Sequence, residues 1–418
     1  MNRSFVYPQD NLSFENQLKI ISRGTEEILL PEELRAKIKH SIEKREPLVI
    51  KFGVDPTAPD LHLGHSVALR KLKDFQDLGH KVVLLIGDFT AKIGDPSQRS
   101  VTRPQLSPED IKINAKTYTD QAFKILNTER TIIDYNSRWF SRMSFEDLLE
   151  LAAKFTVARL LERDDFHNRF HRNISIGLHE FLYPVMQAYD SVILKADVEI
   201  GGTDQKFNML AGREVQKEAG LETQVVITLP ILEGTDGVQK MSKSLGNHIG
   251  LTEPPNEMFG KVMSIPDEVM IRYFKLATTL ALSEIEEIEQ GVEKEEVHPA
   301  DLKRRLGREI VTLYWGKEKA ERAEREFDSV FKRKEIPSEI PSKSVSRELL
   351  KNGKIWIVEL LRETGLAKTN SEARRLIEQG GVKLNQEEII SSDLDISPKT
   401  GDIIQAGKRR FVKIAIKN

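Results

Sequence analysis

The hydrophobic pattern near the start of the chain predicts a strand, a helix and a second strand in succession. An apolar run at 47–54 is followed by a turn-rich segment at 55–60 and by apolar positions at helical spacing from 63 to 78. Gly79 ends this helix, and residues 81–87 are mostly apolar, which is typical of a strand buried on both faces of a parallel sheet. Together these segments predict one βαβ unit.

Further strands and helices continue this alternation. Strands are predicted at 131–135, 191–196 and 223–229, and amphipathic helices at 109–127 and 144–163. Alternating strands and helices predict an α/β fold built on a doubly wound, Rossmann-type parallel sheet. The two amphipathic helices predict a helical insertion between the halves of this sheet.

The remainder of the chain predicts a helical part followed by a small α+β part. Apolar residues from 251 to 333 have helical spacing, and the segment after them has two prolines and no helical pattern, which predicts a linker. Two helices and three short strands are predicted beyond it, at 355–364, 371–379, 382–384, 402–404 and 410–415.

These patterns predict the division of the chain into domains. We expect a Rossmann-type domain with its helical insertion at 1–250, a helical domain at 251–333, a linker at 334–350 and a small α+β domain at 351–418. A length of 418 residues also exceeds what one hydrophobic core usually organises.

Composition limits the class of protein. Hydrophobic residues make up 39% of the chain, and no apolar run is long enough to cross a membrane. The first ten residues lack the apolar stretch of a secretory signal, so we expect a cytoplasmic location and no membrane partner. The absence of cysteine excludes disulfides, thiolate catalysis and zinc held by cysteine.

Charge is distributed unevenly along the chain. Residues 342–418 contain 15 Lys and Arg against 10 Asp and Glu, whereas the residues before them contain 48 against 55. A basic C-terminal segment is compatible with a polyanionic partner, because phosphates are contacted mainly by Lys and Arg. A solvated basic face explains the same pattern.

The segment at 55–65, where the first strand meets the first helix, is suited to binding a nucleotide. A helix start offers free N–H groups and the positive end of a dipole, and Gly64 removes a side chain that would keep a phosphate away. His62 and His65 share one face and can donate to phosphate oxygens as negative charge develops. The alternative is that the two histidines only cap the helix.

A second segment, Lys-Met-Ser-Lys-Ser at 240–244, is a glycine-flanked loop. Lys240 and Lys243, with two hydroxyls, can surround a triphosphate and neutralise departing pyrophosphate. Taken alone, a pair of lysines at this spacing is usually a solvated surface. Its occurrence with the histidine segment upstream is much more specific. No phosphate-binding loop of the P-loop type occurs anywhere in the sequence.

Together the two segments resemble the signatures of the class I aminoacyl-tRNA synthetases, which are written HIGH and KMSKS. The second signature is identical, and the first differs only by Leu63 in place of isoleucine. The resemblance implies that ATP binds with Mg²⁺ as a substrate complex and that the protein has no tightly bound cofactor and no metal site of its own. It also implies catalytic roles for His62, His65, Lys240 and Lys243.

The segment at 183–190 resembles the tyrosine pocket of tyrosyl-tRNA synthetases. By this resemblance Tyr183 and Gln187 contact the ammonium group of the substrate, and Asp190 accepts a hydrogen bond from its phenol. Their spacing places the three side chains on one helix face, where they can converge on a small ligand. An amphipathic core helix with an incidental carboxylate is the alternative.

Further matches to the family imply the rest of the site. Asp95 follows the second strand and matches a residue that binds ammonium, while Asp204 and Gln205 match residues that bind the ribose and the carboxylate region of the substrate. Other implied positions are Gly53 near tyrosine; Asp55, Gly64, Gly202 and Met241 near ATP; and Thr57, Arg99 and Arg103 near the reacting phosphates.

One position departs from the family. Its best-known members have a phenol-contacting tyrosine four residues before the equivalent of Asp55, and this chain has Lys51 there. The lysine side chain either points away from the pocket or pairs with an acid and tunes it.

The C-terminal segment at 369–385 resembles the RNA-binding domain of the ribosomal protein S-four type. The resemblance implies tRNA(Tyr) as a partner, along with L-tyrosine and ATP, and a homodimer. Candidate phosphate contacts, some of which are solvated scaffold charges in the alternative interpretation, are Arg374, Arg375, Lys383, Lys408, Arg409 and Arg410.

The function that these resemblances imply is that of an aminoacyl-tRNA ligase. The enzyme would activate L-tyrosine with ATP to tyrosyl-adenylate and pyrophosphate, and then transfer tyrosine to the 3′ end of tRNA(Tyr). A tryptophanyl-tRNA synthetase shares both signatures but normally lacks the RNA-binding tail. A non-catalytic RNA-binding protein has no physical reason to keep both signatures intact.

Overall fold

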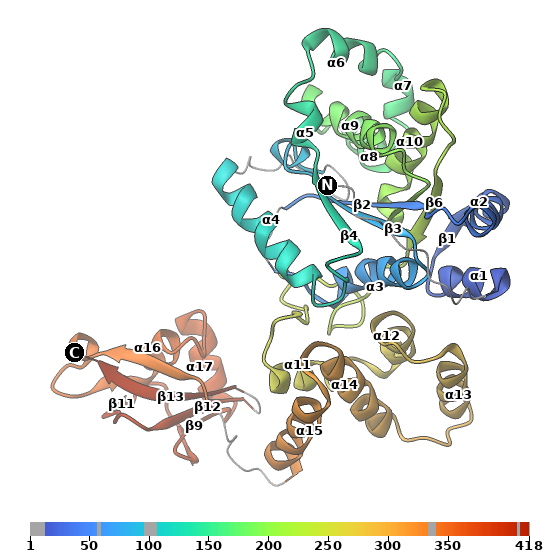
Figure 1. The fold of residues 1–418 in the computed structure, drawn as a ribbon. Coiled ribbons are helices and arrows are strands. Elements are labelled where there is room, and N and C mark those ends of the chain that lie inside the picture. The colour runs from blue at the N-terminus through green and yellow to red at the C-terminus, as the bar shows by residue number, and fades with distance from the viewer. Residues whose placement is uncertain (1–12, 57–59, 96–106, 333–339, 408–409, 418) are drawn as a thin grey trace. The chain divides into compact units, whose positions relative to one another are not determined.

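The structure is a computed structural model that describes residues 13–56, 60–95, 107–332, 340–407 and 410–417 (Figure 1). Its contacts divide the chain into two units, Met1–Ala320 and Glu321–Asn418. The predicted boundary between residues 250 and 251 lies inside the first unit and stays a prediction.

The first unit is built around a six-stranded sheet. The strands lie in the order β1-β6-β5-β2-β3-β4, and all neighbours are parallel except β1 and β6. The predicted doubly wound α/β fold is therefore confirmed. The strands are β1 (Glu27–Leu29), β2 (Val49–Val54), β3 (Lys81–Ile86), β4 (Thr131–Tyr135), β5 (Val198–Gly202) and β6 (Val225–Leu229).

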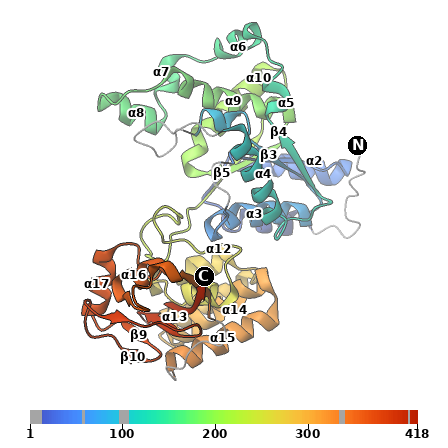
Figure 2. The same ribbon diagram turned by 90° about the vertical axis from the view of Figure 1, so that its left-hand side faces the viewer.

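Helices cover both faces of this sheet. Figure 1 and Figure 2 show α9 and α10 on one face and α3 on the other. The helices up to β6 are α1 (Phe14–Ser22), α2 (Pro31–Lys44), α3 (Leu63–Asp77), α4 (Pro108–Ala122), α5 (Ser137–Phe140), α6 (Phe145–Ala152), α7 (Val157–Leu160), α8 (Asp164–His171), α9 (Leu178–Leu194) and α10 (Lys206–Glu218).

Two local predictions in this region are wrong. Residues 191–194 are not a strand but the last turn of α9, in which the three apolar side chains are half-buried, and a short apolar run does not distinguish a helix turn from a strand. The long helix predicted at 144–163 is interrupted after Ala152. It restarts at α7, where the Thr156 hydroxyl accepts a hydrogen bond of 3.1 Å from the Arg159 N–H and caps a new helix.

A run of helices follows the sheet, as predicted. These helices are α11 (Pro255–Val262), α12 (Met270–Ala277), α13 (Leu282–Glu293), α14 (Pro299–Trp315) and α15 (Lys317–Lys332), the last of which crosses from the first unit into the second.

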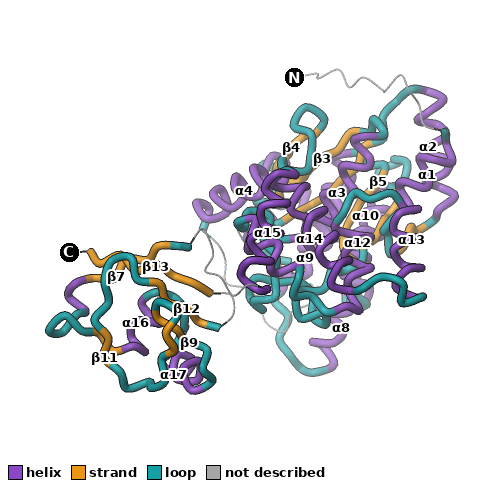
Figure 3. Tube along the Cα trace, turned by 90° about the horizontal axis from the view of Figure 1, so that it is seen from below, coloured by secondary structure: helices purple, strands orange, loops and turns teal. Residues whose placement is uncertain are grey.

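The second unit has its own sheet and core. Five strands lie in the order β10-β9-β12-β13-β7, and α16 and α17 pack against them (Figure 3). The predicted linker contains β7, which pairs with β13 and buries Val345. The elements are β7 (Ser342–Ser346), β8 (Ile355–Trp356), α16 (Ile357–Glu363), α17 (Asn370–Glu378), β9 (Val382–Leu384), β10 (Glu387–Glu388), β11 (Asp395–Ile396), β12 (Ile403–Ala406) and β13 (Arg410–Lys417).

Candidate active site

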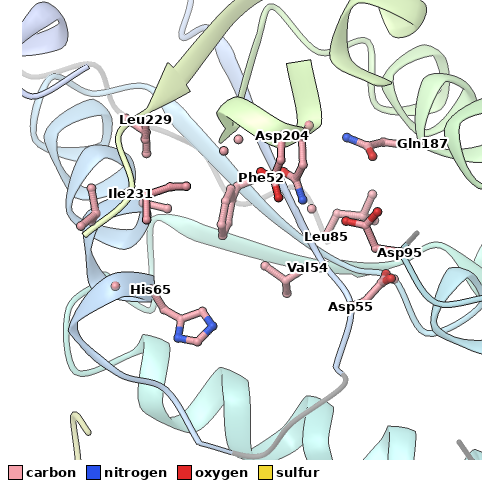
Figure 4. A pocket seen from close by; sticks show the side chains of 18 of the residues that line it. Phe52, Val54, Asp55, His65, Leu85, Asp95, Gln187, Asp204, Leu229 and Ile231 are labelled. Atoms are coloured by element: carbon pink, nitrogen blue, oxygen red, sulfur yellow. The ribbon is translucent and has the colours of Figure 1, made fainter. Parts of the chain in front are cut away.

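A cavity of about 360 Å³ opens at the carboxyl ends of β2 and β5. The strand order reverses between these two strands, and ligands of doubly wound proteins bind at such a point. Asp55 follows β2 and Asp204 follows β5, and both line the cavity. Figure 4 shows Asp95 and Gln187 toward one end of it and His65 at the other.

The two signature segments, which are far apart in sequence, meet beside this cavity. The Leu63 N–H donates to the Ile249 carbonyl at 2.9 Å, and the Leu251 N–H donates to the Leu61 carbonyl at 2.9 Å. A Cβ at Gly64 would lie 3.0 Å from His62 Nδ1 and 3.6 Å from Met241 Cβ, so the two segments come within van der Waals distance at this glycine. The fold thus brings the start of α3 against the loop at 240–244, which is called the lysine loop below.

His62 and His65 line the cavity as neutral side chains. Burial lowers the pKa of His65 to about 4, and burial together with the neighbouring His65 and His248 lowers the pKa of His62 still further. His65 Nδ1 lies 3.3 Å from the His62 backbone N–H and accepts its hydrogen bond. Since Nδ1 is the acceptor, the proton of the neutral His65 ring is on Nε2. His65 therefore serves the helix start and can also donate a hydrogen bond to a ligand.

The side chain of Asn247, three residues after the lysine loop, stabilises the loop by hydrogen bonds. Its side-chain oxygen accepts from the Ser242 N–H at 2.8 Å, and its amide donates to Asp236 at 2.6 Å. Lys240 and Met241 line the cavity. Lys243 instead forms an ion pair with Asp60. It is not among the described residues that line the cavity.

Tyr183 joins the two halves of the cavity. Its hydroxyl donates to Asp55 Oδ2 at 3.0 Å, and Asp55 Oδ1 accepts from the Thr90 hydroxyl at 2.8 Å. Burial raises the pKa of Tyr183 well above its usual value, so its phenol stays neutral. Tyr183 and Gln187 line the cavity from one face of α9, as their spacing predicts.

Asp190 lies at the buried end of the same helix face. It accepts hydrogen bonds from Trp139 Nε1 at 2.9 Å and from Asn136 Nδ2 at 3.4 Å. Burial raises the pKa of Asp190 to about 7, while the charge of Lys51 and these two donors act in the opposite direction. Trp139 and Asn136 are not among the site residues predicted from the sequence, although their place directly after the strand at 131–135 puts them at the carboxyl edge of the sheet.

Asp95, which also lines the cavity, is positioned by an arginine that the sequence analysis missed. Arg163 is buried. Its Nη2 lies 3.0 Å from Asp95 Oδ1, its Nε lies 2.7 Å from Asp165 Oδ1, and its Nη1 donates to Asn208 Oδ1 at 3.2 Å. A planar guanidinium with several donors can fix two carboxylates at once. Arg163 ends the predicted helix at 144–163, and the sequence carries no signal for its role.

The glycine-rich segment after β5 completes the wall. A side chain at Gly201 would meet Gln205 Oε1 at 2.7 Å, so the Gln205 side chain would have to shift if this position were not glycine. Burial, and then the charge of Asp95, raises the pKa of Asp204, while Lys240 lowers it. Gly53, Gly64 and Gly202 also line the cavity.

Lys51 does not point away from the pocket but lines the cavity. It is fully buried, and its Nζ lies 2.9 Å from Glu199 Oε1, 2.7 Å from Ser191 Oγ and 2.9 Å from the Gln187 carbonyl oxygen. The structure thus decides between the two alternatives: the lysine pairs with an acid beside the tyrosine-like pocket.

Several predicted residues are either outside the cavity or outside the described residues. Arg374 and Arg375 are exposed on α17, with the Arg374 guanidinium 5.4 Å from the Trp356 ring centre, and Lys383 is half-buried on β9. Arg410 donates to the Leu366 carbonyl at 2.8 Å, so part of its role is structural. Thr57, Arg99, Arg103, Lys408 and Arg409 lie outside the described residues.

Among the described residues, no group of three His, Asp or Glu side chains is placed to hold a metal ion. In the same part of the chain, every helix is too short or too polar to cross a membrane.

The fold and the two facing signature segments define a class I aminoacyl-tRNA synthetase. A family model described as tRNA synthetases class I (W and Y) matches residues 43–332, and the chain belongs to this family. An S4 domain model matches residues 355–391.

Curated relatives place the chain more finely. A tyrosine–tRNA ligase of Moorella thermoacetica is 51% identical over 95% of each chain, and one of Syntrophotalea carbinolica is 53% identical over 96% of this chain and 98% of the relative. The crystal structure of the Archaeoglobus fulgidus tyrosyl-tRNA synthetase complexed with L-tyrosine matches 75% of this chain and 100% of that one, with a TM-score of 0.61 and 26% identity. Within the class, the chain groups with the tyrosine–tRNA ligases.

Proposed function

We propose that the chain is a tyrosine–tRNA ligase, which activates L-tyrosine with ATP and transfers it to the 3′ end of tRNA(Tyr). The observation that carries this proposal is the position of Asp190. It is a buried carboxylate with two hydrogen-bond donors, on the helix face whose other members line the cavity beside the facing signature segments.

Tyrosine is proposed to bind along α9, between Asp95 and Asp190. The substrate ammonium would contact the carboxylate of Asp95 and the side chains of Tyr183 and Gln187, and the phenol would donate to Asp190. Phenylalanine would leave the Asp190 carboxylate buried without that partner. A site built for a substrate hydroxyl rejects an analogue that lacks it, a rule for which tyrosyl-tRNA synthetases are themselves a standard example.

ATP is proposed to bind between the start of α3 and the lysine loop, with Mg²⁺ arriving as part of the substrate. An oxygen of the tyrosine carboxylate attacks the α-phosphorus, and the bond from that phosphorus to the pyrophosphate oxygen breaks. The carboxylate is already an anion, so no general base and no covalent enzyme intermediate are needed. Catalysis then consists of positioning and charge stabilisation by His62, His65 and Lys240.

Lys243 is proposed to join this group when the loop moves. Lys243 pairs with Asp60 in the structure, two residues before His62. A small movement of the lysine loop would therefore let Lys243 exchange the Asp60 carboxylate for a phosphate of ATP. Thr57, Arg99 and Arg103 are proposed beside the phosphates by resemblance alone.

The transfer step is proposed to involve the second unit. A hydroxyl of the terminal ribose of tRNA attacks the carbonyl carbon of tyrosyl-adenylate and releases AMP. The match of residues 355–391 to an S4 domain and the exposed arginines of α17 support contacts with tRNA phosphates. We also propose that residues 251–333 act on the anticodon side of the tRNA and that the enzyme is cytoplasmic.

A homodimer is supported by exposed apolar side chains on successive helices, from α6 to the start of α9. Isolated exposed hydrophobic residues are common, but a concentration of them in one part of the chain favours an interface. The side chains are Phe145, Leu149, Val157, Phe170 and Leu178, each at least 55% exposed. Sedimentation of the wild type and of Phe145→Glu with Leu149→Glu would test this, with a shift toward monomer expected for the variant.

The function itself is tested by amino-acid-dependent exchange of labelled pyrophosphate into ATP, with each of the twenty amino acids in turn. Only tyrosine is expected to support exchange. Exchange with tryptophan instead of tyrosine would identify the other branch of the family. No exchange with any amino acid, from folded protein, would favour a non-catalytic RNA-binding protein.

A further inference from the structure

Lys51 and Glu199 form an ion pair inside the sheet, beside the tyrosine pocket. They are register partners on the neighbouring parallel strands β2 and β5, and the side chains of both are only 1% exposed. Lys51 itself lines the cavity. The pair therefore lies between the core of the sheet and the proposed substrate.

All polar atoms of this pair are engaged. The three N–H donors of the Lys51 ammonium match three acceptors, which are Glu199 Oε1, Ser191 Oγ and the Gln187 carbonyl oxygen. Glu199 in turn accepts from Ser191 Oγ at 3.0 Å and from the Gln224 side chain. Burying two charges is costly, and a well-packed apolar pair is often as stable, so stability alone is a weak reason for this arrangement.

The pair also holds the part of α9 that faces the substrate. Glu199 Oε1 accepts from Gln187 Nε2 at 3.1 Å, and Gln187 Oε1 accepts from Asn208 Nδ2 at 2.8 Å, which fixes the orientation of the Gln187 amide. Lys51 bonds to the backbone of Gln187 and the side chain of Ser191, on either side of Asp190. Movement of the pair would move both ends of the tyrosine site.

We propose that Lys51 and Glu199 are a specificity-determining pair of positioning residues. Lys51 favours the charged form of the Asp190 carboxylate and holds the helical turn that carries it, and Glu199 orients Gln187. This inference rests on the proposed function. It gives Lys51 an electrostatic role at the position where the best-known members of the family contact the phenol directly.

The charges around Asp190 make the inference testable by pH. Lys51 on β2 favours the charged form of Asp190, and Glu199 on β5 disfavours it. Trp139 and Asn136, which approach from the segment after β4, favour the charged form by hydrogen bonding. Once Asp190 is protonated, bound phenylalanine no longer leaves a buried charged carboxylate without a hydrogen bond from the substrate. Discrimination between tyrosine and phenylalanine should therefore fall as pH decreases through the pKa of Asp190.

The pH at which half of the discrimination between tyrosine and phenylalanine is lost is called the midpoint here. Two substitutions should move this midpoint in opposite directions. The ratio of kcat/KM for tyrosine to that for phenylalanine would be measured by pyrophosphate exchange from pH 5.5 to 9. Lys51→Met should raise the midpoint by about one pH unit or more, because a nearby opposite charge typically lowers a carboxyl pKa by roughly that amount. Glu199→Gln, which keeps the shape of the side chain but replaces one accepting oxygen with a donating amide group, should lower it because it removes the negative charge.

Controls separate this role from general damage. Lys37→Met breaks another largely buried pair, with Asp197 at 3.1 Å, and should leave the midpoint unchanged. Midpoints equal to that of the wild type in folded Lys51→Met and Glu199→Gln would overturn the inference. If Lys51→Met does not fold, the direction of the Glu199→Gln shift decides alone. A wild type that shows no tyrosine-dependent exchange would instead refute the proposed function.

Discussion

The Tyr183 hydroxyl donates a hydrogen bond of 3.0 Å to Asp55 Oδ2 and so links the helix proposed to bind the amino acid with the segment proposed to bind ATP. Tyr183 belongs to α9, and Asp55 follows β2 at the point where the strand order reverses. Through this bond, a ligand in one half of the cavity can affect a residue of the other half.

Tyr183→Phe tests this link. A hydrogen bond to a charged group contributes about 1.5–3 kcal/mol, so kcat/KM for tyrosine should fall by about tenfold or more. The measurement is pyrophosphate exchange at several concentrations of tyrosine and ATP. Tyr189→Phe is the matched control, because Tyr189 packs with Phe140 and lies in the apolar cluster of the insertion. Equal effects of the two changes would contradict the link.

Lys240→Ala and Lys243→Ala should each slow adenylate formation by about 10²-fold, by analogy with the loss of one preorganised donor to developing charge. Exchange at the wild-type rate would refute a role of the changed lysine in pyrophosphate departure. Lys275→Ala removes a partly exposed lysine that pairs with Glu289, and it should have little effect.

Arg163→Met should raise KM for tyrosine by about tenfold or more. The change leaves the largely buried carboxylates of Asp95 and Asp165 without their shared cation, and breaking such a pair is costly. Arg163→Lys should restore only part of the affinity, because an ammonium lacks the planar set of donors. Arg159→Met, which removes a surface arginine paired with Glu162 and Glu214, is the control and should leave KM unchanged.

Asp190→Asn should reduce discrimination between tyrosine and phenylalanine, because the amide carries no charge for phenylalanine to strand. The ratio of activation efficiencies for the two amino acids is the measurement. An unchanged ratio would remove Asp190 from phenol recognition.

His80 should make stability depend on pH. Burial lowers the pKa of His80 to about 4 in the folded protein, against 6.5 as its ordinary value. The unfolded chain therefore takes up this proton first, and the free energy of unfolding should decrease as pH falls from 6.5 to 4, by up to about 3 kcal/mol. Urea unfolding at pH 5 and 7.5 should show a smaller decrease for His80→Gln. The exposed His179→Gln should behave like the wild type.

The sequence predicts most of the first unit's sheet and the residues most concerned with chemistry. Strands at 47–54, 81–87 and 223–229 are recognisable because each is a short apolar run between turn residues. The signature segments are recognisable because they resemble those of the class I synthetases, and each is short and local in the chain. The run at 191–196 is misleading, since a buried helix turn and a buried strand have the same composition.

The partners of these residues were decided by the tertiary structure alone. Lys51 and Glu199 are 148 positions apart and become neighbours only when β2 and β5 pair. Arg163 and Asp95, or Asp60 and Lys243, have no sequence signal that joins them, because an ion pair requires proximity and not spacing. By itself the sequence determined the class of fold and the chemical groups. The three-dimensional packing determined which of those groups share a charge, a proton or a hydrogen bond.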